Sequence, residues 1–152
     1  MEGTEAVVAP PASAMCYSAR VPVDFDIDLD RVRAFLRGKA DGRRAQIDER
    51  FERATHDAQA IVAEIARVVE PRRIYQWGSL LNRERFTEIS DIDIALEGLA
   101  DAEQFFAALG LAMERSTLPV DVVELEKLPP TTAERIRERG KLVYERDEPA
   151  DP

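Results

Sequence analysis

Two short stretches of alternating polar and apolar residues constrain the fold of this chain most. They are SDIDIAL at residues 90–96 and PVDVVEL at residues 119–125. Successive side chains of a strand point to opposite faces, so Asp91 and Asp93 would share one face and apolar neighbours would fill the other. The β-branched run around Asp121 favours a second strand. The sequence therefore predicts strands that bring three carboxylates together on one face of a sheet.

A Gly-Ser pair lies upstream of these acids. Gly78 and Ser79 follow a predicted strand at 72–77 and precede a short segment that could form the first turn of a helix. Glycine lets the backbone approach a ligand closely, and free N–H groups at such a turn point at anions, with the serine hydroxyl as a further donor. We therefore expect Gly78 and Ser79 to bind phosphate.

The three acids have the chemistry of a magnesium site. Mg²⁺ is held in proteins by a few carboxylate oxygens together with substrate phosphates, and paired metals can stabilise an in-line displacement. We therefore predict that Asp91, Asp93 and Asp121 are both metal ligands and catalytic residues. The alternative is that they are ordinary turn or strand-edge aspartates. Alternation of acids alone does not identify a metal site, because the chain contains a second alternating acidic run: Asp24, Asp26, Asp28 and Asp30. This run has no upstream Gly-Ser pair, and we interpret it as an extended edge and a helix N-cap.

The order of these motifs resembles the DNA polymerase beta-like nucleotidyltransferase superfamily. The shared pattern is an apolar residue, Gly-Ser, a spacer of about ten residues, Asp-x-Asp and a later acid on a strand. Within the superfamily the chain is most similar to the minimal nucleotidyltransferase (MNT) antitoxins, from about Ile74 to Tyr144. The resemblance implies an α/β (α+β) fold, with a mixed sheet flanked by helices and, in this chain, an N-terminal helical extension.

The segment after Gly-Ser departs from the family pattern. Relatives often carry a small residue, an arginine and a glycine there, whereas this chain reads LLNRER at residues 80–85. We expect Arg83 and Ser90 to join Gly78 and Ser79 in binding the nucleotide. The alternative for Arg83 and Arg85, which is equally compatible with the sequence, is that they are solvated charges on a loop.

The resemblance also implies a function. An MNT antitoxin transfers AMP from ATP, with Mg²⁺, to a tyrosine of a HEPN-type toxin, and the two proteins form a hetero-oligomer. The sequence leaves two alternatives open: an antitoxin that neutralises its toxin by binding alone, and an adenylyltransferase for a small molecule such as an aminoglycoside.

Composition narrows the class of protein. The chain has 152 residues and a net charge of −9, which fits one domain and disfavours nucleic-acid binding, since phosphate contacts dominate that affinity. A single cysteine, Cys16, excludes an intrachain disulfide, and no apolar run is long enough to cross a bilayer. We therefore expect a cytoplasmic protein without membrane contact.

The sequence predicts one domain between two irregular ends. Residues 1–20 are expected to be disordered and residues 147–152 to form a mobile tail. The domain at 21–146 would comprise a helical extension, 21–70, and a catalytic core, 71–146. The predicted core elements are strands at 72–77, 91–96, 119–125 and 141–145 and helices at 101–115 and 131–139.

Several local signals predict where helices begin and end. The extension is expected to hold a short helix at 30–37, ended by Gly38, and a long helix at 42–70. Asp101 with Gln104, and Thr131 with Glu134, have the spacing of a capping box, in which two side chains satisfy the first N–H groups of a helix. Gly140 would end the last helix in a left-handed conformation.

Overall fold

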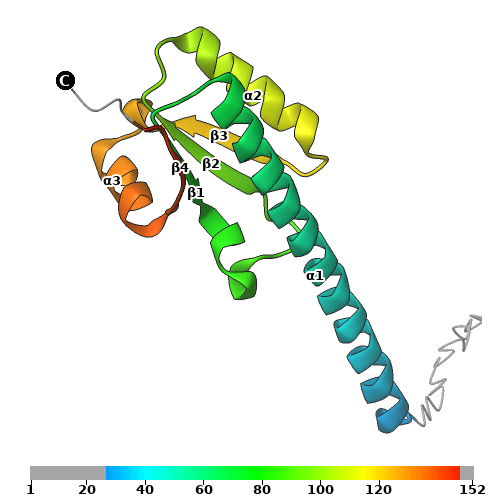
Figure 1. The fold of residues 1–152 in the computed structure, drawn as a ribbon. Helices are drawn as coiled ribbons and strands as arrows, with labels where there is room; N and C mark the ends of the chain where they lie inside the picture. The colour runs from blue at the N-terminus through cyan, green and yellow to red at the C-terminus, as the bar shows by residue number, and fades with distance from the viewer. Residues whose placement is uncertain (1–26, 148–152) are drawn as a thin grey trace, which may run out of the picture.

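A computed structural model describes residues 27–147 and contains a four-stranded mixed sheet (Figure 1). The strand order is β3-β2-β1-β4; β2 and β3 run parallel, and β1 is antiparallel to β2 and β4. The predicted mixed α/β architecture is thus confirmed, while the expected disordered segment 1–20 lies outside the described residues. The strands are β1 (Arg73–Trp77), β2 (Ile92–Glu97), β3 (Val120–Glu124) and β4 (Lys141–Glu145).

Helices cover both faces of the sheet. The helices are α1 (Leu29–Val68), α2 (Ala102–Arg115) and α3 (Pro130–Arg139). The C-terminal half of α1 packs with α2 against one face, and α3 packs against the other (Figure 1). Because a parallel pair needs a crossover connection, α2 links β2 to β3.

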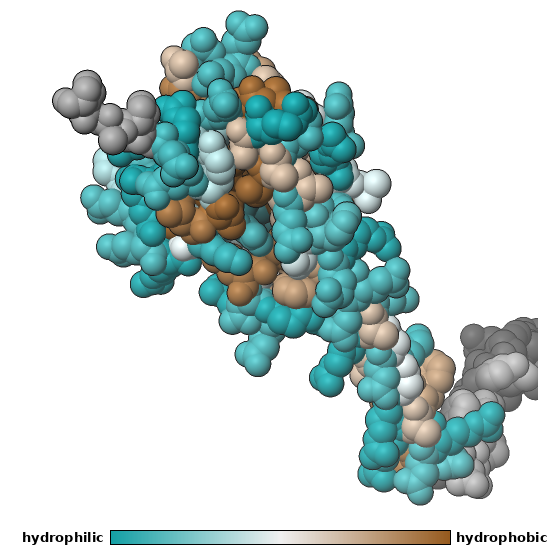
Figure 2. Space-filling view, viewed as in Figure 1, coloured by the Kyte–Doolittle hydropathy of each residue, from teal (hydrophilic) through white to brown (hydrophobic). Residues whose placement is uncertain are grey.

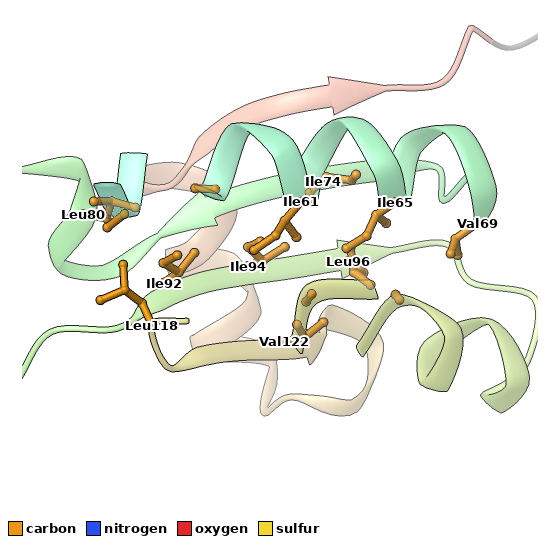
Figure 3. Packing of buried hydrophobic residues seen from close by; sticks show 14 of the residues in the cluster. Ile61, Ile65, Val69, Ile74, Leu80, Ile92, Ile94, Leu96, Leu118 and Val122 are labelled. Atoms are coloured by element: carbon orange, nitrogen blue, oxygen red, sulfur yellow. The ribbon is translucent and has the colours of Figure 1, made fainter. Parts of the chain in front are cut away.

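The main core lies between the sheet and the α1–α2 layer. Ile61 and Ile65 of α1 are fully buried against Ile74 of β1 and Ile94 of β2 (Figure 3). The period of two in β2 sends Ile94 into this core and Asp93 to the opposite face. Burial of the isoleucines therefore fixes the face on which the acid lies.

The predicted break in the first helix is wrong, because α1 continues from Leu29 to Val68 through Gly38 and Gly42. A glycine inside a helix destabilises it by only about 1 kcal/mol relative to alanine, which does not break a long helix. The expected N-cap is confirmed: the Asp28 carboxylate accepts hydrogen bonds from the backbone N–H groups of Asp30 at 3.1 Å and Arg31 at 3.0 Å.

The N-terminal half of α1 extends away from the body of the molecule (Figure 1). All residues from 27 to 46 are exposed. Arg43 of this half forms an ion pair with Glu88 of the body, and the surface of this half is mostly hydrophilic in Figure 2. Within the described part of the chain, no helix has the length and apolar character needed to cross a membrane.

The ends of the later helices agree only in part with the predicted caps. The Asp101 carboxylate accepts a hydrogen bond from Gln104 N at 2.9 Å, which confirms that cap. The Thr131 cap is wrong: α3 begins at Pro130, whose fixed φ suits a first helical position, and no side chain caps it. The left-handed end at Gly140 is also wrong, since its φ is −73°.

Gly140 is required for a different reason, which is close packing. A Cβ on this residue would lie 2.5 Å from Ile136 O and 3.2 Å from Gln76 O. The absence of a side chain therefore lets the end of α3 approach β1.

Candidate active site

Three adjacent strands place a row of side chains across the face of the sheet opposite the main core. Trp77 at the end of β1 is the cross-strand partner of Asp93 in β2, and Asp93 is in register with Asp121 in β3. Asp93, in the middle of the row, is buried, and Asp121, at its β3 end, is exposed. Two of the three predicted carboxylates are therefore immediate neighbours on paired strands.

Gly78 lies against the central acid of this row. Its φ is +78°, a conformation that disfavours any side chain, and a Cβ at this position would overlap the Asp93 carboxylate. Two independent requirements thus select glycine. The structure therefore shows a close approach of the Gly78 backbone to the Asp93 carboxylate, while phosphate binding at Gly78 stays a prediction.

The environment of Asp93 disfavours its charge. Burial, and then the negative charges of Asp91 and Asp121, raise the pKa of its carboxyl group from the usual 3.8 to about 6. Asp91 is half-buried and directly precedes β2. The three acids predicted from sequence therefore interact electrostatically, and a bound cation would relieve their repulsion.

The acids do not form a complete metal-binding cage. Within residues 27–147 no three His, Cys, Asp or Glu side chains are grouped closely enough to hold a metal ion by themselves. Mg²⁺ usually takes one or two carboxylates, several waters and substrate phosphates instead. The concentration of negative charge at Asp93 fits that kind of site, with Asp91, Asp93 and Asp121 as the residues that would hold the ion.

A cavity opens beside the Gly-Ser turn. Gly78 and Ser79 begin a short 3₁₀ helix, η1 (Gly78–Leu81), and line a cavity of about 470 Å³ together with Trp77. Its remaining wall includes Arg85 from a second 3₁₀ helix, η2 (Arg83–Arg85), and two arginines of α3, Arg135 and Arg139.

The α3 arginines are residues that sequence reasoning missed. Their spacing of four places them on one side of a helix, and that pattern in TTAERIRERG was the available signal. Arginine pairs at this spacing are common on solvated helices. Only the packing of α3 beside Gly78 distinguishes these two.

Two other predicted nucleotide-binding residues, Arg83 and Ser90, interact with side chains or backbone of the protein itself. Arg83 forms an ion pair with Asp48 of α1, and its guanidinium lies 5.3 Å from the centre of the Phe51 ring. The Ser90 hydroxyl accepts a hydrogen bond from Thr87 N at 2.9 Å, and the serine is buried. Neither residue lines the cavity that holds Gly78 and Ser79.

The site combines a mixed sheet, two acids on neighbouring strands, a third acid just before β2 and a Gly-Ser turn against Asp93. This combination is typical of the nucleotidyltransferase class of site. Comparison with family models agrees: the model described as "Polymerase beta, Nucleotidyltransferase" matches residues 59–149. The chain belongs to this family. A comparison with curated proteins gives no match.

Family membership supports nucleotidyl transfer as the activity of this chain. That reaction generally requires a nucleoside triphosphate and a divalent metal. The matched residues begin in the packed half of α1 and include every strand of the sheet. The protruding half of α1 lies outside them.

Proposed function

We propose that this protein is an antitoxin of the MNT type, which transfers AMP from ATP to a tyrosine hydroxyl of a HEPN-type toxin. The observation that supports the transfer reaction is the environment of Asp93. Its carboxylate interacts with the charges of Asp91 and Asp121 and lies against Gly78. The protein acceptor and the toxin rest on the motif resemblance to MNT antitoxins.

The reaction exchanges a phosphoanhydride bond of ATP for a phosphodiester bond to the acceptor. The acceptor oxygen forms a bond to the α-phosphorus of ATP, the bond from that phosphorus to the bridging oxygen of the β-phosphate breaks, and pyrophosphate leaves. Asp121 is exposed, so an approaching hydroxyl can reach it, and its carboxylate can accept the hydroxyl proton. When bound at the acids, Mg²⁺ supplies positive charge that stabilises the transition state.

The exposed end of α1 supports a protein partner. Leu29, Val32 and Leu36, which step by three and four and so share one side of the helix, have exposed fractions of 59%, 42% and 58%. Grouped apolar side chains on a protruding element are typical of protein interaction sites. The same observation favours a second candidate function, in which the protein neutralises a toxin by contact and the acids are dispensable. A small-molecule acceptor is the remaining candidate.

Mass measurement of the acceptor tests the proposal. The full chain is incubated with ATP, Mg²⁺ and the protein encoded by the adjacent gene, which is the candidate toxin, and the intact mass of that protein is measured. We expect an increment of one or more AMP units with wild type and with Glu114→Gln, an exposed acid on α2, and none with Asp93→Asn. Toxin neutralisation by Asp93→Asn without any increment would instead establish the contact mechanism.

A further inference from the structure

We propose that the cavity lined by Arg85, Arg135 and Arg139 binds the β- and γ-phosphates of the nucleotide and the pyrophosphate that leaves. This inference rests on nucleotidyl transfer as the reaction. It assigns the leaving-group site to α3, a helix that carries none of the acids or the Gly-Ser turn.

The three arginines are available for an anion. No carboxylate in residues 27–147 forms an ion pair with any of them, and all three are exposed. Many other arginines of the same region are paired, for example Arg83 with Asp48 and Arg115 with Glu64. Guanidinium groups bind phosphate oxygens through two parallel N–H donors, so a group of three arginines favours a chain of phosphates.

Trp77 supplies a second observation in the same wall. Its indole Nε1–H is buried and has no hydrogen-bond partner. Buried donors of this kind usually have an acceptor. A ligand or a ligand-bound water in the cavity would provide one.

Packing fixes α3 relative to the sheet. Ile136 is buried against β1, and the Arg137 Nη2 donates a hydrogen bond to Glu97 Oε1 at 3.0 Å. The glycine at position 140 lets the last turn of α3 approach the backbone of β1. The positions of Arg135 and Arg139 beside the Gly-Ser turn are therefore set by the fold.

The order of groups across the sheet assigns the cavity to the leaving group. Asp121 is on β3, Asp93 is on the adjacent β2, and Gly78 follows β1 on the far side of Asp93. Gly78 contacts Asp93 and also lines the cavity. An in-line displacement requires the attacking and leaving oxygens on opposite sides of the phosphorus. With the acceptor at Asp121, the pyrophosphate is directed toward the arginines.

This arrangement also accounts for the departure from the family pattern after Gly-Ser. The arginine that relatives often carry there is absent, and the nearby Arg83 is paired with α1. Arg85 and the two arginines of α3 supply positive charge at that place.

Binding measurements with inorganic tripolyphosphate test the assignment without any acceptor. Titration calorimetry is performed on the full chain with Mg²⁺ for wild type, the double variant Arg135→Gln/Arg139→Gln and the control Arg115→Gln, whose arginine lies on α2. We expect the double variant to bind tripolyphosphate at least about tenfold more weakly and AMP within about twofold of wild type. The control should match wild type for both ligands. Unchanged tripolyphosphate binding in the double variant, or no binding to wild type, would overturn the assignment.

Two further readouts separate this inference from the transfer reaction and from misfolding. If tripolyphosphate binding depends on Arg135 and Arg139 but no AMP is transferred, the cavity assignment stands and the proposed function is wrong. If transfer proceeds with an unchanged KM for ATP in the double variant, the cavity assignment is wrong and the proposed function stands. The charge-conserving variant Arg135→Lys/Arg139→Lys should recover part of the binding, and its thermal melting should match that of the glutamine variant.

Discussion

Asp93, the central acid of the candidate site, has a cost for the stability of the fold. Its carboxyl is buried next to two other acids, and its pKa is raised to about 6. The folded protein therefore binds this proton more tightly than the unfolded chain, whose aspartates titrate near 3.8. The stability contributed by this difference is present at low pH and is lost as pH rises toward 6.

We expect Asp93→Asn to stabilise the metal-free protein above pH 7 by on the order of 2 kcal/mol, because the amide carries no charge to bury. The difference from wild type should be small near pH 4. Thermal or urea unfolding at several pH values measures it. Adding Mg²⁺ should stabilise wild type more than the variant, and an equal response of both proteins would argue against metal binding at this acid.

Gly78→Ala should be severely damaging, because the added methyl group would overlap the Asp93 carboxylate at a backbone φ of +78°. We expect a loss of about 1–3 kcal/mol in stability and loss of nucleotide transfer. Denaturant unfolding and the transfer assay measure the two effects. Gly38→Ala is the matched control, since a Cβ there meets nothing within 4 Å. A Gly78→Ala protein with wild-type activity would contradict the contact that defines the site.

At the scale of elements, the parts of the site set by local pattern could be predicted from sequence. Strand alternation placed Asp93 opposite the core, and the Gly-Ser turn followed its strand as expected. The register of Asp93 with Asp121 depends on the pairing of distant strands, and the approach of α3 to Gly78 depends on packing around Ile136. No local signal in the sequence encodes either.

The first helix shows the opposite error, where a local signal was overvalued. Gly38 and Gly42 suggested an end and a new start, yet α1 passes through both. We expect Gly38→Ala and Gly42→Ala to strengthen the helix by about 1 kcal/mol each. Because this half of α1 is exposed throughout, the gain should appear in local amide hydrogen exchange of residues 30–45 rather than in the global melting temperature. Unchanged exchange there would mean that the helix is already held by other contacts.

At the scale of the whole molecule, the core and the protruding half of α1 are separable. The apolar contacts between α1 and the body begin at Ile47, and residues 27–46 are all exposed. We expect a chain that starts at residue 45 to melt within about 3 °C of the full chain and to bind ATP equally well. Loss of cooperative unfolding in the shortened chain would show that the protruding half belongs to the folding unit. A shortened chain that folds but no longer co-purifies with the neighbouring gene product would place the partner contact on this half.

Transfer of the α-phosphate label of ATP is the decisive test of nucleotidyl transfer at this site. The full chain and the neighbouring gene product are incubated with Mg²⁺ and ATP labelled at either the α- or the γ-phosphate, using wild type and Asp93→Asn. We predict that the α label becomes covalently attached to protein in the wild-type reaction only, and that the γ label is released as pyrophosphate. Attachment of the γ label, or attachment of the α label that persists in Asp93→Asn, would contradict nucleotidyl transfer at this site.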